Sequence, residues 1–326
     1  MFKKLNVKVL IIVLVVLAAI YAISEYTGNK DRSFSRVLFA VDTASVNEIL
    51  IRIPADKTDI KLVRNAVADW SVESDGNRFA ADYSVVKSIL SQFGEMKPER
   101  IAAASRERWN DFEITDSAAI QVKLNSGNKN LAEVYFGKFS YTQPPQGQGQ
   151  MQMQQQQGRM TTFVRKAKDD KVYAVEGFLR MTYQKDVNSY RNKNLVNVNR
   201  DDVSRLTFNY PGYSFVVEKS DQKWLINNQP ADSLKTMRYL SRLQRLTSTS
   251  FVQPGTPKTS DEVYRLVIEG NNFSPVELKA LSTPDTTIRH IITSSINPEG
   301  EFDGAKGQLF SRTFVGETEF LPDIPE

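Results

Sequence analysis

Two distant stretches of the sequence have nearly the same order of residue types. Residues 69–96 are "DWSVESDGNRFAADYSVVKSILSQFGEM" and residues 223–246 are "KWLINNQPADSLKTMRYLSRLQRL". In each stretch a Trp opens a short strand-like run, and a polar turn follows. An Ala-Asp pair then precedes apolar residues spaced with the period of a helix. A repeat of this kind restricts the fold, because the same structural unit is expected twice.

The similarity extends upstream, where "VDTASVNEILIRI" precedes the first stretch and "VNRDDVSRLTFNY" precedes the second. Equivalent apolar positions there are separated by a constant 157 residues, as between Val46 and Val203. The separation falls to 150 residues at Asp82 and Asp232. Insertions and deletions confined to turns are tolerated by a duplicated fold. We therefore predict two tandem, internally duplicated units.

Each unit is predicted to begin with three strands followed by one main helix. The predicted strands are Glu48 to Ile53, Ile60 to Arg64 and Trp70 to Glu73 in the first unit, and Arg205 to Tyr210, Ser214 to Lys219 and Trp224 to Asn227 in the second. Asp82 and Asp232 are predicted N-caps of the two helices. The apolar helix faces are predicted to bury Val86, Ile89, Leu90 and Phe93 in one unit, and Leu234, Met237, Leu240, Leu243 and Leu246 in the other.

Further strands are predicted after each helix. They are "AIQVKL", "LAEVYFG", "TTFVRKA" and "KVYAVEGFL" in the first unit, and "YRLVIEG", "VELKAL", "TIRHIITS" and "GQLFSRTFV" in the second. The fold class is therefore α+β, with an antiparallel sheet and one main helix in each unit. The predicted units span residues 38–195 and 196–326. Trp70 and Trp224 could be exposed stacking platforms for a ligand, but their repeated place before a helix favours core packing.

The N-terminal residues 1–26 are predicted to be a transmembrane helix that acts as a signal anchor, joined to the first unit by a linker over residues 27–37. Lys3, Lys4 and Lys8 precede an apolar run from Val9 to Ile23. The positive-inside rule leaves the N-terminus in the cytoplasm and sends the rest across the membrane. A cleaved signal peptide, with Ala22 to Ser24 at the cleavage site, is the alternative. Both hypotheses place the bulk of the chain outside the cytoplasm.

The segment "YTQPPQGQGQMQMQQQQGRM" interrupts the first unit between two predicted strands. It is rich in Gln, Gly and Pro and has no apolar periodicity, so residues 143–158 are predicted to be a disordered insert. A tolerated insertion in a hairpin explains such a tract, and a tether for a partner is the alternative.

Composition excludes several kinds of site. The chain has no Cys, which removes disulfides, Cys-ligated zinc and thiol nucleophiles. Its 42 basic and 38 acidic residues are spread along the chain without a basic block, so we expect no nucleic acid partner. "RSFSR" and "SYRNKN" place Arg and Lys near aromatic residues, and a solvated face is the expected explanation for both.

No catalytic constellation is recognised. The single His290 alternates with apolar residues, which is typical of a histidine satisfied within a strand. Three carboxylate pairs could support acid–base chemistry, and they are Asp201 with Asp202, Asp169 with Asp170, and Asp111 with Glu113. The first two pairs are expected in turns. We therefore expect no catalytic, cofactor or metal residues.

In several short motifs the chain resembles the domain-of-unknown-function family 4340. They are the Trp-initiated strand, the Ala-Asp helix start, "ERWNDFEI", a strand ending "VYFG" and the later "VYAV". The stretch from Trp109 to Ile114 departs from the family, which usually has a Tyr-Gly-Leu-like turn there, and the Gln-rich insert is another departure. The resemblance implies anchoring at an extracytoplasmic membrane face and genes often placed beside ABC-2-type, gliding-motility-like export systems. It implies no catalytic residues.

We expect a non-enzymatic accessory or assembly subunit working with an ABC-type exporter or cell-envelope complex. It would be a single-pass inner-membrane protein with a cytoplasmic N-terminus and a periplasmic bulk, bound to protein partners and without cofactors. A polysaccharide- or peptidoglycan-binding module that uses exposed aromatics such as Tyr210 and Tyr213 is the alternative. A hydrolase using an acidic pair is the third hypothesis.

Overall fold

The computed structural model describes residues 14, 16–18, 37–142, 159–183 and 185–323 of the chain. Most of the predicted anchor (residues 1–26), most of the linker and the whole insert (residues 143–158) therefore lie outside the described residues. Within the described part of the chain, no helix is long and apolar enough to cross a membrane.

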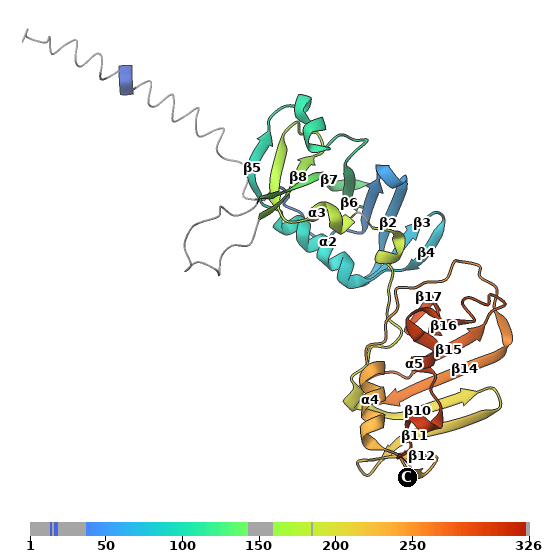
Figure 1. Ribbon diagram of the computed structural model, residues 1–326. Helices are drawn as coiled ribbons and strands as arrows, with labels where there is room; N and C mark the ends of the chain where they lie inside the picture. Colours follow the sequence, from blue (N-terminus) through green and yellow to red (C-terminus); the bar gives the residue numbers. More distant parts are fainter. Residues whose placement is uncertain (1–13, 15, 19–36, 143–158, 184, 324–326) are drawn as a thin grey trace, which may run out of the picture.

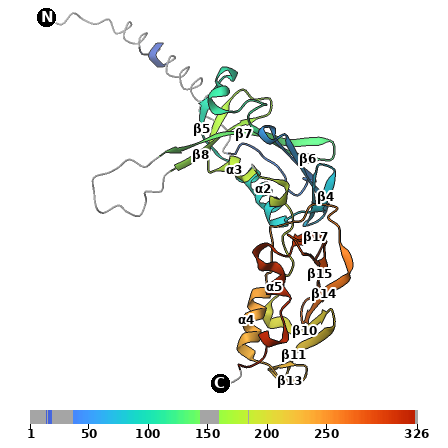
Figure 2. The ribbon, with the colours of Figure 1, turned by 45° about the vertical axis from the view of Figure 1, so that its right-hand side comes forward.

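The described chain is mostly β-structure and forms two antiparallel sheets with few helices (Figure 1). We call residues 37–190 the first lobe, residues 191–194 the connecting segment, and residues 195–323 the second lobe. The two lobes follow one another end to end, and both views show the same arrangement (Figures 1 and 2).

The described residues of the first lobe form nine strands and two α-helices. They are β1 (Glu48–Ile53), β2 (Thr58–Ala66), β3 (Asp69–Ser74), β4 (Asn77–Ala80), α2 (Tyr83–Glu95), β5 (Pro98–Ala103), β6 (Ile120–Ser126), β7 (Lys129–Thr142), β8 (Arg159–Lys166), β9 (Val172–Glu176) and α3 (Leu179–Tyr183). The strand order in its sheet is β4-β3-β2-β1-β6-β7-β8-β9-β5.

The second lobe holds eight strands and two α-helices. They are β10 (Val203–Tyr210), β11 (Tyr213–Ser220), β12 (Lys223–Ile226), β13 (Gln229–Pro230), α4 (Ser233–Leu243), β14 (Thr259–Gly270), β15 (Val276–Ser282), β16 (His290–Ser294), β17 (Asn297–Asp303) and α5 (Leu309–Thr313). The strand order in its sheet is β13-β12-β11-β10-β14-β15-β16-β17.

The first strand of each lobe lies inside its sheet and connects two meanders. Ile51 of β1 pairs with Ile60 of β2 on one side and with Val122 of β6 on the other. Likewise Phe208 of β10 pairs with Phe215 of β11 and with Leu266 of β14. The strands on the other side of the first strand, β6 and β14, come after the main helix in the sequence. The main helix is therefore part of the connection between the two meanders, and it covers one face of the sheet.

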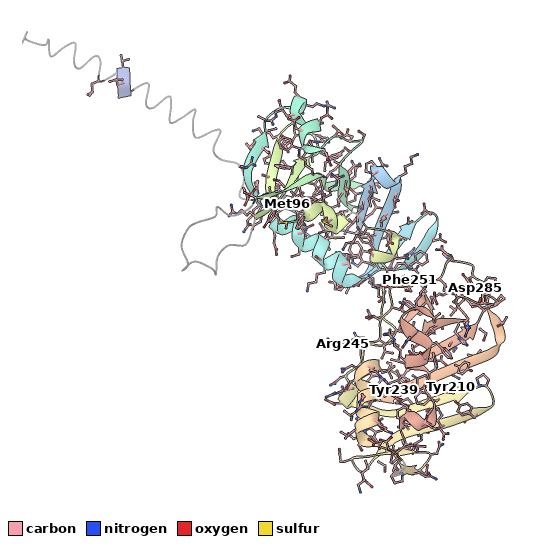
Figure 3. The ribbon with its side chains drawn as sticks, viewed as in Figure 1. Met96, Tyr210, Tyr239, Arg245, Phe251 and Asp285 are labelled. Carbon is pink, nitrogen blue, oxygen red and sulfur yellow. The ribbon has the colours of Figure 1, made fainter. Side chains whose placement is uncertain are left out.

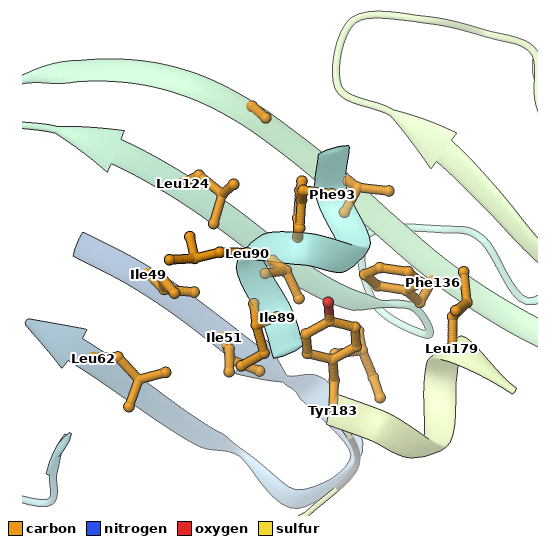
Figure 4. Packing of buried hydrophobic residues seen from close by; sticks show 14 of the residues in the cluster. Ile49, Ile51, Leu62, Ile89, Leu90, Phe93, Leu124, Phe136, Leu179 and Tyr183 are labelled. Atoms are coloured by element: carbon orange, nitrogen blue, oxygen red, sulfur yellow. The ribbon is translucent and has the colours of Figure 1, made fainter. Parts of the chain in front are cut away.

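Helix α2 packs on the first sheet through the predicted face. Its buried residues are Val86, Ile89, Leu90 and Phe93, as the helical spacing predicted. They lie against apolar residues of the strands and of α3 (Figure 4). Asp82 caps the helix by accepting a hydrogen bond from Ser84 N at 2.9 Å, which confirms the predicted N-cap.

Helix α4 has its predicted N-cap, but its buried face is different from the one predicted. Asp232 accepts hydrogen bonds from the backbone amides of Leu234 and Lys235. The buried helix residues are Thr236, Tyr239, Leu240 and Leu243, with Leu246 buried just beyond the helix. The prediction for Leu234 was wrong, because its side chain is 78% exposed. Leu234 lies two residues before Thr236, about 200° around the helix from the buried face.

Both Trp residues lie in the cores, as predicted. Trp70 belongs to the buried cluster of the first lobe and Trp224 to that of the second. The carbonyl of each Trp accepts a hydrogen bond from the Ala of the helix entrance, Ala81 N at 2.8 Å and Ala231 N at 2.9 Å. The hypothesis of exposed stacking platforms is therefore wrong for both indoles.

Two elements near the C-terminus differ from the prediction. "GQLFSRTFV" contains helix α5, not a strand, and buries Leu309 and Thr313. The last strand is β17, which the sequence did not predict because it contains Pro298 and Gly300. A proline is tolerated there because β17 is at the edge of its sheet. The short strands β4, β5 and β13 were also missed.

Replacing Trp70 or Trp224 with Ala is expected to lower the free energy of unfolding by about 3–5 kcal/mol, the cost of emptying a core aromatic site. Chemical denaturation followed by circular dichroism measures the change. Tyr213→Ala is the control, because Tyr213 is an exposed aromatic residue of a strand. A loss below about 1 kcal/mol for both Trp variants would contradict their core role.

Deleting residues 143–158 is expected to change the free energy of unfolding by less than about 1 kcal/mol, because loop-closure cost grows slowly with length. The flanking residues Thr142 and Arg159 are paired in the β7–β8 ladder, so a two-residue Asn-Gly turn can join them. A thermal melt of the deletion variant beside the full chain tests this, and a large loss of melting temperature would show that the insert stabilises the fold.

Candidate functional site at the junction of the two lobes

The connecting segment 191–194 is hydrogen-bonded to both lobes. On the first lobe, Asn192 N donates to Ala80 O at 2.8 Å, and Arg191 forms an isolated β-bridge with Ala81. On the second lobe, Ser248 N donates to Lys193 O at 3.0 Å. The segment is thus held as extended backbone between two partners.

Arg191 is the central side chain of this junction. Its guanidinium carbon lies 3.7 Å from the ring centroid of Phe79 and 3.7 Å from that of Phe251. Phe79 belongs to β4 of the first lobe, and Phe251 to the second lobe, where it forms a bridge with Phe302 of β17. The label of Phe251 in Figure 3 marks the place where the lobes meet. The guanidinium is therefore stacked between one ring from each lobe.

The charge of Arg191 is buried but retained. The side chain is 4% exposed, and its Nη1 donates to Asn188 Oδ1 at 3.2 Å. Burial lowers the pKa of Arg191 to about 10, and the nearby Glu301 acts in the opposite direction. A pKa of about 10 still leaves the guanidinium protonated at neutral pH, so both rings contact a cation.

Asn297 holds the second lobe to the connecting segment from the other side. Its Nδ2 donates to Asn192 O at 2.8 Å and to Asn194 O at 3.3 Å, and the residue is buried. Asn297 is the first residue of β17, and β17 lies beside β4 of the first lobe. A buried amide that serves two carbonyls fixes the path of the backbone it contacts.

A polar cleft of about 1000 Å³ opens beside this junction. Residues of the first lobe, the connecting segment and the second lobe line it, among them Asn65, Asp69, Trp70, Arg78, Asp82, Tyr83, Asn192, Asn194, Ile296, Asn297 and Glu299. Clefts at such interfaces are common places for ligands and partners.

Hydrogen bonds order the first-lobe wall of the cleft. Arg78 donates to Asn65 Oδ1 at 2.5 Å and lies 3.7 Å from a carboxylate oxygen of Glu73. Asn65 Nδ2 donates to Asp69 Oδ1 at 3.3 Å. Asp82 lies 4.0 Å from Lys193 Nζ, close to the helix cap. The wall therefore offers amides and both signs of charge, which suits hydrogen bonding to a polar ligand or peptide.

The predicted candidate residues do not meet at this cleft. His290 is the first residue of β16, where its ring stacks on Phe310 at 3.9 Å, so its place in a strand is confirmed. Asp201 and Asp202 form a 3-10 turn before β10, and Asp169 and Asp170 lie in the turn between β8 and β9, as predicted.

Asp111 and Glu113 are each engaged by an arginine. Asp111 accepts from Arg108 Nε at 3.0 Å, and Glu113 accepts from Arg180 Nη1 at 2.7 Å. Within the described residues, no group of three or more His, Asp or Glu is placed to hold a metal ion.

The two aromatics proposed for a glycan platform differ in exposure. Tyr210 is buried and its hydroxyl donates to Val315 O at 2.8 Å, with burial raising its pKa. Tyr213 is exposed and lies edge-on to Tyr210. The expectation was therefore wrong for Tyr210, whose ring is covered by neighbouring aromatics.

The junction itself was missed by the sequence analysis. "SYRNKN" contains Arg191, which was expected on a solvated face, and that expectation was wrong. The other segment, "RSFSR", lies outside the described residues. The partners of Arg191 are 112 positions upstream at Phe79 and 60 positions downstream at Phe251, so nothing local in the sequence marks the contact.

Replacing Arg191 with Ala is expected to lower the free energy of unfolding by about 2–4 kcal/mol, since a desolvated cation–π contact contributes up to about 2 kcal/mol and Arg191 has two. Arg191→Lys keeps the charge without the planar stack and should lose less. Double-mutant cycles with Phe79→Leu and Phe251→Leu measure the coupling energy between Arg191 and each ring. If the losses in free energy of unfolding are additive, they contradict the proposed stack.

Comparison with known proteins supports the resemblance over part of the chain. The model of one family, described as "Domain of unknown function (DUF4340)", matches residues 152–266. No curated protein and no solved structure matches the chain. The matched segment includes "VYAV", the connecting segment, Trp224 and the Ala-Asp start of α4. The similarity to the family model is thus limited to residues 152–266, which span the end of the first lobe, the connecting segment and the beginning of the second lobe.

Proposed function

We propose that the protein is a non-enzymatic, membrane-anchored accessory subunit that assembles with an ABC-type exporter or cell-envelope complex on the extracytoplasmic side. The stack of Arg191 between Phe79 and Phe251 is the observation that carries this proposal. Enzymes that close over a substrate need a hinge between their lobes. Here Arg191 is buried, the rest of the connecting segment is half-buried, and the segment is hydrogen-bonded to both lobes. This favours a body that holds binding surfaces at fixed positions.

The membrane attachment in this proposal rests on the sequence. Lysines precede an apolar run that ends at Ile23, and the predicted linker ends at residue 37. Directly after the linker, Leu38 is bonded to the body of the first lobe, because its backbone N donates to Met96 O at 2.9 Å. A short linker of this kind would keep the first lobe near the membrane and direct the second lobe away from it.

The state of the acidic residues supports a role without acid–base catalysis. Asp111 and Glu113 are bound to different arginines, while Asp169 accepts from the hydroxyl of Tyr173 at 2.8 Å. Carboxylates engaged in this way stabilise local structure. The hydrolase hypothesis would need one of these pairs to be free for a substrate.

The attachment is tested by washing membranes. The full chain should stay in the membrane pellet through high salt and carbonate, whereas a variant starting at Lys30 should be released. A mature N-terminus at Glu25, found by mass spectrometry, would overturn the anchor and leave export across the membrane in place.

The partner is tested by affinity capture from detergent-solubilised membranes after chemical cross-linking. Transporter subunits should be recovered with the full chain, and recovery should fall with Arg191→Ala if fixed lobes are needed. Arg289→Ala, at an exposed arginine in the β15–β16 loop, is the matched control. Recovery of glycan with no transporter subunit would favour the polysaccharide-binding alternative and overturn the proposal.

We also infer that the two lobes arose by internal duplication. The buried positions of the main helices correspond at a constant separation of 150 residues, and the pairs are Val86 with Thr236, Ile89 with Tyr239, Leu90 with Leu240 and Phe93 with Leu243. Asp82 N donates to Tyr190 O and Asp232 N to Phe320 O, at 2.8 and 2.7 Å. The strand orders agree over eight strands when β5 is set aside.

A helix exchange tests the duplication. Residues 82–96 and 232–246 have the same length, so each can replace the other without a change in any loop. Equivalent units should accept the exchange and keep a cooperative thermal transition, with a lower midpoint because the core side chains differ. A control receives the same residues in shuffled order, and an exchange variant that unfolds as completely as this control would contradict equivalence.

A further inference from the structure

An exposed apolar patch lies at one end of the first lobe. Phe139, Tyr141 and Met181 are 46%, 50% and 56% exposed, although they are large apolar side chains. Phe178 is half-buried just before α3, three positions ahead of Met181, and joins them because its ring meets Phe139 edge-on at 4.9 Å. Met160, which is half-buried, pairs with Tyr141 across the β7–β8 ladder. We call these five residues the end patch.

The end patch is on the same end of the sheet as the point where the chain enters the lobe. Across the strands, Phe139 pairs with Thr162, Thr162 with Val175, and Val175 with Pro98. Three strand spacings of about 4.8 Å place Phe139 roughly 14 Å from Pro98. Met96, two residues before Pro98, accepts the hydrogen bond from Leu38 N and is labelled at this end of the lobe in Figure 3.

The linker limits how far this end can lie from the predicted anchor. Residues 27–37 span at most about 40 Å when fully extended. The end patch is therefore held close to the bilayer for as long as the anchor is retained. Tethering raises the effective concentration of lipid at the patch, so a weak intrinsic affinity is enough for contact.

We propose that the end patch contacts the lipid bilayer interface on the extracytoplasmic side and orients the first lobe on the membrane. This inference rests on the membrane attachment in the proposed function. Tyr prefers the membrane interface, where its ring is among apolar groups and its hydroxyl among headgroups. Phe and Met supply apolar area, and a group of such residues with three exposed members marks an interaction surface.

The charges around the end patch indicate an apolar contact and not an electrostatic one. Arg159 lies 3.5 Å from Glu99, and Arg180 is bound to Glu113. Glu176, beside the patch on β9, is exposed. These two arginines are thus paired with carboxylates, while Lys138, next to Phe139, is exposed. Binding to neutral phosphatidylcholine should therefore be retained at high salt, unlike the binding of a basic surface.

The absence of cysteine makes a site-specific test possible, because an introduced thiol is unique. Tyr141→Cys and Phe139→Cys are labelled with an environment-sensitive fluorophore in the full chain. Val67→Cys is the matched control, since Val67 is 92% exposed in the turn between β2 and β3 of the same lobe. Each protein is reconstituted into nanodiscs of phosphatidylcholine, with and without brominated acyl chains.

The expected result is a blue shift and at least twofold quenching by brominated lipid at positions 139 and 141, and neither effect at position 67. Equal signals at all three positions would overturn the proposal. If the protein stays in the membrane but the label at position 141 reports an aqueous environment, the lipid contact of the patch is refuted and the anchor is not. If carbonate washing releases the protein, the anchor is refuted.

Two further results would overturn the lipid contact and show that the end patch is covered by protein. A shift seen in native membranes but not in nanodiscs would assign the patch to a protein partner. The label at position 141 can also be tested in the chain that starts at Lys30, in the absence of lipid. If the label is protected there from quenching by iodide, and deletion of residues 143–158 removes the protection, the patch is covered by the chain itself. Replacing Phe139, Tyr141 and Met181 together with Ser should abolish quenching of a label at position 178 without releasing the protein from the membrane.

Discussion

The relative position of the two lobes depends on one buried cation. The lobes cannot move apart without pulling Phe79 of the first lobe or Phe251 of the second away from Arg191. Burial of a guanidinium is costly, and two aromatic faces with a hydrogen bond to Asn188 offset part of that cost, while its Nε is buried without a hydrogen-bond partner. The polar cleft beside the junction has a defined shape because its two walls are fixed by this contact.

A second buried arginine has the same arrangement within the first lobe. Arg165 lies 3.9 Å from the ring centroid of Trp109 and 3.8 Å from that of Tyr135, and it donates to Asp116. Trp109, which belongs to the "ERWNDFEI" motif, donates to Asp170 O at 2.9 Å. The motif thus packs a small separate core on the face of the first sheet opposite α2. Planar stacking explains why Arg, and not Lys, is found at both places.

The end patch and the junction lie at opposite ends of the first lobe, and this separation gives the molecule a direction. The junction, marked by Phe251 in Figure 3, lies away from Met96, which accepts the hydrogen bond from Leu38 at the chain entry. If the end patch lies on the bilayer, the fixed junction determines how far the second lobe extends from the membrane. A partner complex would then meet the second lobe and the polar cleft at a set height.

The sequence by itself determined most of the strands, the two helix caps and the core place of both Trp residues, because these follow from contacts within a few residues or from period alone. It missed β4, β5, β13 and β17 and predicted a strand where α5 lies. It predicted the four buried positions of α2 but misjudged α4, where Tyr239 replaces Leu234 in the core. Only the tertiary structure decided the junction and the end patch. Arg191 looks like a surface residue until β4 and the second lobe supply its rings, and such long-range contacts leave no local periodicity to detect.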